Sequence, residues 1–99
     1  MIMSDSNNEE EFYSKLKVQL EETSEWPSGY LYKFIVKSDL TKIAKIEALF
    51  DNTGAVINTI ESKNGKYTSV SINVIMKNPD AVIEKYLEVA INIEGVISL

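Results

Sequence analysis

The sequence predicts a single α+β domain in which two helices cover one face of a four-stranded antiparallel sheet. Two observations carry this prediction. After an initial helical pattern, strand and helix patterns follow in the order βαββαβ, and an Asn64-Gly65 dipeptide separates the two middle strands, as in a hairpin. Right-handed crossovers would place both helices on the same face of the sheet. The length of 99 residues suits one domain with one hydrophobic core.

The chain divides into three parts. Residues 1–8 are polar and predict a flexible N-terminus, residues 9–29 predict a helix and a loop, and residues 30–99 predict the α+β domain. The first helix is expected over Glu9–Glu22. Its apolar side chains repeat every fourth residue and are Phe12, Leu16 and Leu20. The loop that follows contains one large aromatic anchor, Trp26.

The first strand is predicted over Tyr30–Lys37, which is rich in aromatic and β-branched residues. Its core-facing side chains are Tyr32, Phe34 and Val36. A helix is then expected over Leu40–Phe50, with Ser38 or Asp39 as its N-cap. Gly54 is expected to be the left-handed residue that follows the end of this helix.

The buried face of this second helix is predicted to consist of Leu40, Ile43, Ala44 and Phe50, with Ile46 at its margin. Glu47 falls inside the same face. Two interpretations of Glu47 stay open: a side chain that reaches water near a helix end, or a buried functional carboxylate.

The two middle strands are predicted over Ala55–Lys63 and Tyr67–Met76, joined by a type I′ turn at Asn64-Gly65. A two-residue turn fixes the register. The expected pairs are Lys63 with Lys66, Thr59 with Val70, and Ile57 with Ile72. One set of alternate side chains then faces the core: Ala55, Ile57, Thr59, Val70, Ile72, Val74 and Met76. The other set faces away: Val56, Asn58, Ile60, Tyr67, Ser69, Ser71 and Asn73.

The last helix is expected to begin at Pro79, after Asn78 as its N-cap, and to extend to about Ile91. Gly95 interrupts the pattern, and Val96–Leu99 predicts a short final strand. The complete order of elements is that of the ferredoxin-like plait, with the N-terminal helix as an addition.

The composition disfavours catalysis. The chain contains no cysteine, no histidine and no arginine, and all ten basic residues are lysines. It therefore lacks a thiolate nucleophile, the side chain that titrates nearest neutrality, and the bidentate fork that binds phosphate. No phosphate-binding loop, dinucleotide-binding glycine motif or nucleophile elbow occurs. We therefore expect no enzyme, no metal site and no cofactor.

The net charge of −5 disfavours a nucleic-acid partner, because neutralising phosphates requires clustered cations. RNA binding through stacked bases is a third functional alternative, but Tyr67 is followed on the same face by Ser69 and Ser71, which offer no ring. The sequence shows neither a transmembrane run nor a signal peptide, so we expect no membrane association and a cytoplasmic location.

Four stretches carry a resemblance to a known family: Trp26-Pro27, residues 32–36, residues 62–71 and residues 95–97. From Phe12 to Leu99 the chain resembles the YbeD-like family of small uncharacterised bacterial proteins. The resemblance implies a ferredoxin-like plait similar to the ACT regulatory domains, which bind amino acids. It brings no assigned activity and no functional residues.

This likeness raises amino-acid sensing as an alternative function. ACT domains hold small ligands at a dimer interface, usually beside the loop between the first strand and the first helix of the plait. That loop commonly carries glycine, which allows close backbone approach. Here the loop is Lys37-Ser38-Asp39 and contains no glycine, so the sequence departs from the pattern at the position where a ligand would bind.

The sheet face away from the two crossover helices is the predicted functional surface. Its apolar side chains are Leu31, Ile35, Val56, Ile60 and Ile75. Its polar side chains are the candidate ligand- or partner-binding residues: Lys33, Asn58, Tyr67, Ser69, Ser71 and Asn73. A monomer rarely leaves a large apolar patch exposed to water, so something should cover it.

Three occupants of this face are considered. The N-terminal helix could cover it through Phe12, Leu16, Leu20 and Trp26, a second copy of the chain could self-associate there, or an unknown partner protein could bind. We therefore expect a non-catalytic regulatory or protein-interaction module.

Overall fold

The computed structural model describes the backbone of residues 2–99 and the side chains of residues 10–99. The helices of this part of the chain are α1 (Ile2–Thr23), α2 (Leu40–Leu49) and α3 (Pro79–Asn92). The strands are β1 (Ser28–Lys37), β2 (Val56–Glu61), β3 (Tyr67–Met76) and β4 (Ile97–Ser98). The predicted order of elements is confirmed.

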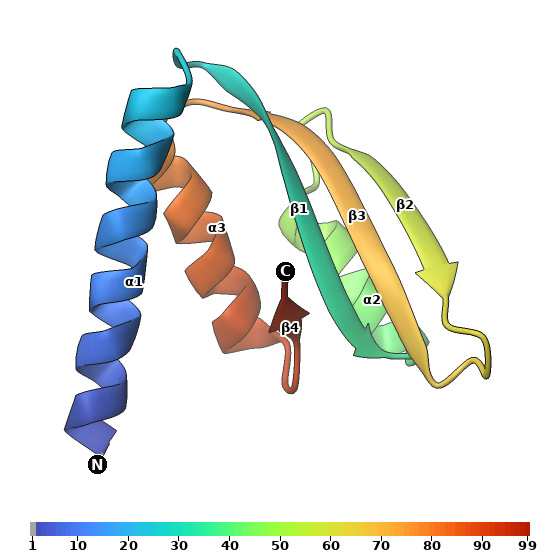
Figure 1. Ribbon diagram of the computed structural model, residues 1–99. Helices are drawn as coiled ribbons and strands as arrows, with labels where there is room; N and C mark the ends of the chain where they lie inside the picture. The colour runs from blue at the N-terminus through green and yellow to red at the C-terminus, as the bar shows by residue number, and fades with distance from the viewer. Residues whose placement is uncertain (1) are drawn as a thin grey trace.

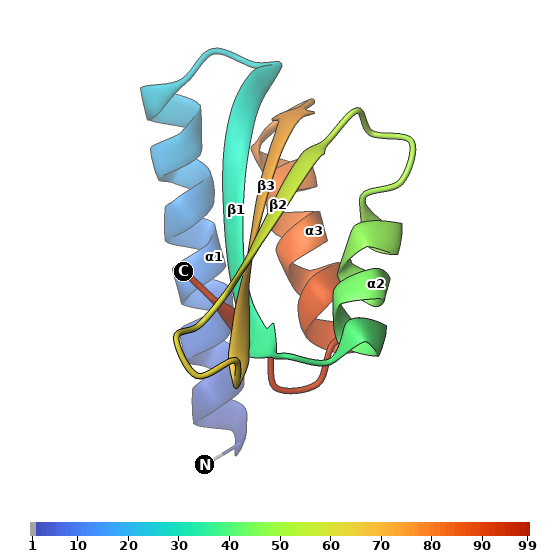
Figure 2. The ribbon, with the colours of Figure 1, turned by 90° about the vertical axis from the view of Figure 1, so that its right-hand side faces the viewer.

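The four strands form one antiparallel sheet with the order β2-β3-β1-β4. Both α2 and α3 lie on the same side of this sheet (Figure 2). The α+β class and the four-stranded antiparallel sheet are therefore confirmed, and the arrangement is compatible with a ferredoxin-like fold. β4 is short and pairs with the middle of β1, where Ile97 lies opposite Ile35.

The core fills the space between the sheet and the two crossover helices. Alternate side chains of β1 and β3 enter it, as the strand pattern predicts. Its fully buried side chains are Tyr32, Phe34, Val36, Ile46, Val70, Ile72, Val82, Val89 and Ile93. Burying an apolar side chain of this size contributes roughly 1.5–3 kcal/mol, so this layer holds α2 and α3 to one face of the sheet.

The N-terminal helix does not cover the other face. α1 lies beside α3, beyond the edge of the sheet formed by β1 and β4 (Figure 1). The ring of Tyr13 is 6.4 Å from that of Tyr86, and Lys17 Nζ is 3.1 Å from a carboxylate oxygen of Asp80 at the start of α3. The structure therefore argues against α1 as the occupant of the predicted functional surface.

Two details of α1 differ from the prediction or extend it. The helix begins at Ile2 rather than at Glu9, because the weak helix propensity of Ser, Asp and Asn costs only some tenths of a kcal/mol per residue. The expected flexibility of residues 1–8 stays a prediction. At the C-terminal end of α1, the Trp26 indole N–H donates to the Leu20 carbonyl oxygen at 3.1 Å, so this hydrogen bond connects the following loop to the helix. The peptide bond between Trp26 and Pro27 in that loop is cis.

The predicted hairpin register is confirmed, with Ile57 opposite Ile72, but the predicted turn type is wrong. The Gly65 N–H donates to the Ser62 carbonyl at 2.8 Å, and Gly65 is left-handed with φ of 74° whereas Asn64 is not. Ser62 faces Tyr67, since its N–H donates to the Tyr67 carbonyl at 2.7 Å, so the loop comprises the four residues 63–66, with one left-handed glycine. Asn64 uses its side chain instead, since its Oδ1 accepts from the Ser62 hydroxyl at 3.2 Å.

β2 is also shorter than expected, over Val56–Glu61 instead of Ala55–Lys63. The predicted Lys63–Lys66 pair falls outside the ladder. Thr59, which the alternation assigns to the core, is exposed because β2 forms the edge of the sheet.

The buried face of α2 differs from the prediction. Ile46 is fully buried at the centre of that face, whereas Leu40 and Ala44 are exposed. Glu47 is exposed as well, which supports the interpretation of a water-reaching side chain over a buried carboxylate. Gly54 is left-handed with φ of 75°, but α2 already ends at Leu49, so this glycine turns the chain into β2 rather than ending the helix.

Candidate functional site: the open face of the sheet

The sheet face opposite α2 and α3 is called the open face here. The register assigns to it alternate residues of all four strands. These are Leu31, Lys33, Ile35, Lys37, Val56, Asn58, Ile60, Tyr67, Ser69, Ser71, Asn73, Ile75 and Ile97. All six residues predicted as candidate binding residues lie on this face.

The strand register arranges three of the predicted polar residues in one row. Ser71 of β3 lies directly between Lys33 of β1 and Asn58 of β2. Directly opposed residues in an antiparallel sheet have their Cβ atoms about 5 Å apart, so these three side chains form a contiguous polar band. The band crosses the middle of the open face.

Apolar side chains flank this band on both sides. On one side, Leu31 and Val56 are paired through Asn73. On the other, Ile35 and Ile60 are paired through Ser69. Leu31 is 54% exposed, Val56 60%, Ile60 69% and Ile75 72%, so these side chains stay largely in water.

The open face also contains two residues that the sequence analysis did not select as candidates. Lys37 lies opposite Tyr67, and alternation along β1 was sufficient to find it. Ile97 extends the row of Ile35 onto β4, and its placement required the register of a two-residue strand, which no local pattern provides.

A shallow hollow of about 410 Å³ lies at one end of the open face. Leu31, Val56, Asn73 and Ile75 line it, together with Gly29 and Gly54. The glycines contribute no side chain, and nothing lies within 4 Å of an added Cβ at either position. The lining is thus mainly apolar, with one amide group for a directional hydrogen bond.

The charges of the open face are of one sign. Lys33 and Lys37 have the charged side chains among the described open-face positions, and no side-chain carboxylate accompanies them. The whole chain has a net charge of −5, so its carboxylates are concentrated on other surfaces. The open face is therefore locally cationic on an acidic protein.

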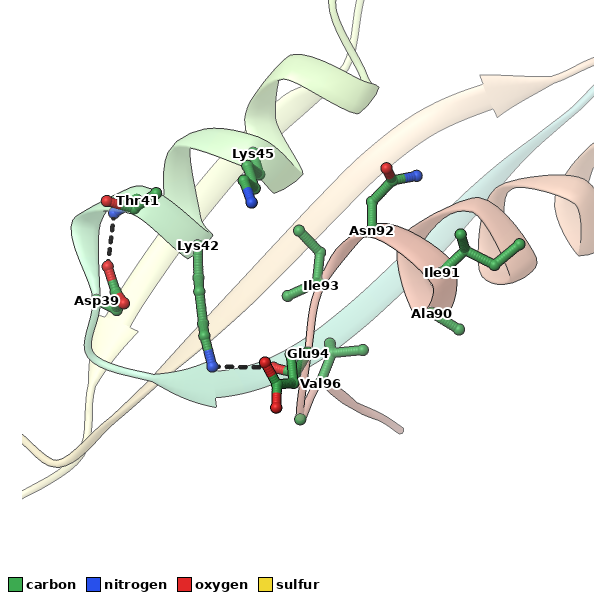
Figure 3. A pocket seen from close by; sticks show the side chains of 11 residues that line it. Asp39, Thr41, Lys42, Lys45, Ala90, Ile91, Asn92, Ile93, Glu94 and Val96 are labelled. Atoms are coloured by element: carbon green, nitrogen blue, oxygen red, sulfur yellow. Dashed lines mark hydrogen bonds between the residues drawn. The ribbon is translucent and has the colours of Figure 1, made fainter.

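A second hollow, of about 640 Å³, lies between the start of α2 and the end of α3 (Figure 3). Asp39 is the N-cap of α2, and its Oδ1 accepts from the Thr41 N–H at 2.8 Å. Lys42 Nζ donates to the Glu94 carbonyl oxygen at 2.9 Å across the hollow, and Lys45 also lines it. This hollow adjoins the loop at which an ACT-type ligand is expected.

Buried tyrosines form a third group, between α3 and β1. The hydroxyl oxygens of Tyr30 and Tyr86 are 2.7 Å apart, and the Tyr32 hydroxyl donates to the Val82 carbonyl at 3.0 Å. Burial raises the pKa of Tyr86, and the hydrogen bond with Tyr30 raises it further. Burial likewise raises the pKa of Tyr32. Neither phenol is poised to lose a proton near neutral pH.

Among the described side chains, no group of three or more Asp, Glu, His or Cys residues could hold a metal ion. Over the same part of the chain, none of the helices combines the length and apolarity needed to span a bilayer. Neither a protein-family model, nor a curated protein, nor a solved structure matches this chain. The functional argument therefore rests on the geometry of the open face and of the two hollows.

Proposed function

We propose that this chain is a non-catalytic protein-interaction or regulatory module that binds its partner through the open face. The observation that carries the proposal is the exposure of Leu31, Val56, Ile60 and Ile75 around a polar band, on the face opposite α2 and α3 (Figure 2), with α1 displaced beside α3 (Figure 1). A patch of this kind on a single-domain protein is typical of an interaction surface.

We also propose that the fold is a ferredoxin-like plait and that the chain is related to the YbeD-like family. The strand order β2-β3-β1-β4, with two crossover helices on one face, supports the first part. The stretches from Trp26-Pro27 to residues 95–97 support the second. The expected cytoplasmic location stays a prediction.

Photo-crosslinking tests the interaction role. A photoreactive amino acid replaces Asn73, which lines the hollow at one end of the open face, and in a matched variant it replaces the exposed Glu47 on α2. Illumination in lysate of the producing cells should give a discrete adduct with another protein at position 73 and none at position 47. No adduct at position 73, or equal adducts at both positions, would contradict the proposal.

Amino-acid sensing is the second candidate function. It is favoured by the 640 Å³ hollow beside Asp39, in which Lys42 and Lys45 could neutralise a ligand carboxylate. A thermal-shift screen tests it with single amino acids at millimolar concentration, where a ligand of millimolar Kd raises the stability measurably. The expected result is a rise in Tm that Lys42→Ala diminishes, and a screen without any rise counts against this function.

RNA binding is the weaker third candidate. One aromatic side chain, Tyr67, is exposed on the open face at 44%, beside Lys37. Stacking platforms for RNA need two or three such rings. A single-stranded RNA that stays bound at high salt would favour this function over the first.

A further inference from the structure

We infer that the open face binds an amphipathic helix of a partner protein that carries carboxylates beside its apolar stripe. This inference rests on the proposed function and adds the chemistry of the partner. It follows from the charge of the open face, from the position of Lys33, and from the way the same sheet is covered on its other side.

No side chain among residues 10–99 forms an ion pair with the lysines of the open face. The ion pairs of the described side chains involve Lys15, Lys17 and Lys85, and these lie on α1 and α3. Lys33 and Lys37 take part in none of them. Their charges are therefore available to a partner, and an anionic partner complements them.

Lys33 lies where any partner must cover it. It stands between Leu31 and Ile35 along β1, and both of these belong to the apolar rows that flank the polar band. A partner that removes both rows from water also buries the ammonium group between them. Desolvating this charge without a counter-charge is unfavourable, so a partner that supplies a carboxylate at that point is favoured over a neutral one.

A second copy of the chain does not meet this requirement. Sheets stacked face to face lie about 10 Å apart. In such a dimer, Lys33 of one copy would face the other copy's open face, whose described side chains include no carboxylate. Nucleic acid would satisfy the lysines, but it would leave the apolar rows of Leu31 and Ile60 without apolar contacts.

A helix is the appropriate shape for the partner segment. The opposite face of this sheet already binds two amphipathic helices, and each of them presents an apolar stripe to alternate side chains of β1 and β3. A partner helix on the open face would contact Leu31, Val56 and Ile60 in the same manner. Its flanking carboxylates would reach Lys33 at the centre and Lys37 at the rim.

Three synthetic peptides test the inference directly. They have equal length and the same leucine stripe, and their remaining positions are Glu, Gln or Lys. The full-length chain is labelled with ¹⁵N and titrated with each peptide at low salt. We expect the Glu peptide to shift the amide signals of Leu31, Asn58 and Ser71, with a Kd about fivefold lower than that of the Gln peptide.

Two variants make this test specific. Lys33→Gln should reduce the preference for the Glu peptide over the Gln peptide, because only Lys37 then remains on the open face. Lys15→Gln removes an exposed lysine of α1 instead, and should retain the preference. Raising the salt concentration should reduce the preference in the parent chain, because exposed charges are screened.

The outcomes separate this inference from the proposed function. Equal Kd values for the Glu and Gln peptides, or no binding of any peptide at the open face, overturn the acidic-helix inference, while an adduct at position 73 still supports the interaction role. Tighter binding of the Lys peptide, or of oligouridine titrated in the same way, also overturns it. So does a parent chain that is a dimer in solution and that Leu31→Glu converts to a monomer. If no adduct forms at position 73, both conclusions fail.

Discussion

The two faces of the sheet are built from the same strands, but one is buried against helices and the other is exposed to water. On β3, Val70, Ile72 and Val74 are buried against the helices, whereas Asn73 and Ile75 are exposed on the other side. Because side chains alternate along a strand, neighbouring residues belong to different environments. We therefore expect folding stability to depend mainly on one face and partner binding on the other.

Polar groups show the same difference. On the core side, the buried Thr68 hydroxyl is 2.8 Å from that of Ser38, and no buried polar atom of the described side chains lacks a hydrogen-bond partner. On the open face, Lys33 has no ion pair among the described residues. Buried polar groups that are satisfied fix a unique packing, while the exposed and hydrated Lys33 ammonium group is available to a partner.

Two isoleucines of β3 give the largest expected contrast. Ile72 is fully buried in the core and Ile75 is 72% exposed on the open face. Ile72→Ala should lower the free energy of unfolding by about 3 kcal/mol, through lost burial and the cavity left behind. Ile75→Ala should change it by less than about 0.5 kcal/mol. Urea unfolding measures both, and equal losses would contradict the division of roles.

Alkaline pH should weaken the core face through its tyrosines. Their pKa values are raised in the folded state, so Tyr86 and Tyr32 keep their protons at a pH where the unfolded chain has lost them. The stability they contribute is complete below pH of about 10, the usual tyrosine pKa, and falls as pH rises toward the folded pKa. In that window, each of the two tyrosines lowers the free energy of unfolding by about 1.4 kcal/mol for every unit by which the pH rises.

Tyr86→Phe isolates this effect. The free energy of unfolding of the variant should fall less steeply than that of the parent above pH of about 10, by up to about 1.4 kcal/mol per pH unit. Urea unfolding at a series of pH values measures the slope. Tyr67→Phe, which removes a hydroxyl from the open face, is the control. Identical slopes for the parent and Tyr86→Phe would show that burial of this phenol does not couple to folding.

A smaller contrast concerns a single hydroxyl. The Tyr32 hydroxyl donates to the Val82 carbonyl inside the core, whereas Tyr67 is 44% exposed on the open face. Tyr32→Phe should lower the free energy of unfolding by about 1 kcal/mol, the net value of one buried hydrogen bond. Tyr67→Phe should leave it unchanged within about 0.5 kcal/mol. A loss with Tyr67→Phe as large as that with Tyr32→Phe would contradict the contrast.

Much of the fold was predictable because its signals are local. The alternation in β3 gave both ends of the strand, Tyr67 and Met76, and the Asn78-Pro79 pair marked the start of α3. The Oδ1 of Asn78 does accept from the Ala81 N–H, at 2.8 Å. Such features depend on a few neighbouring residues and not on the rest of the chain.

The errors arose where tertiary packing decides between local alternatives. Nothing near Leu40 in the sequence says that it points to water while Ile46 is buried, because the rotation of α2 depends on the sheet beneath it. The type I′ turn failed for a different reason, since the side chain of Asn64 hydrogen-bonds Ser62 and only Gly65 becomes left-handed. The register nevertheless agreed with the prediction.

The candidate site was predictable as a face but not as a charge pattern. Alternation alone put Lys33, Ser71 and Asn58 on one surface, and the register then joined them in a row. The place of α1 beside α3 was not predictable, because its stripe of Phe12, Leu16 and Leu20 fits any apolar surface. Only the fold shows that none of the three described helices covers the open face (Figures 1 and 2).

Two lysines give the smallest contrast between the faces. On the core side, Lys85 Nζ contacts the Leu49 carbonyl at the end of α2, lies 3.2 Å from Glu88, and is 5.3 Å from the centre of the Phe50 ring. Its side chain is 21% exposed. Lys85→Met keeps the apolar stem and removes the charge, so we expect a loss of about 1 kcal/mol from the carbonyl and ring contacts.

Lys33→Met applies the same change to the open face. Without an ion pair to lose among the described side chains, this variant should have a free energy of unfolding within about 0.5 kcal/mol of the parent, while its preference for the Glu peptide over the Gln peptide decreases. Urea unfolding and peptide titration of both variants make the comparison. If Lys33→Met costs as much stability as Lys85→Met, then Lys33 supports the fold, and the open face is not reserved for a partner.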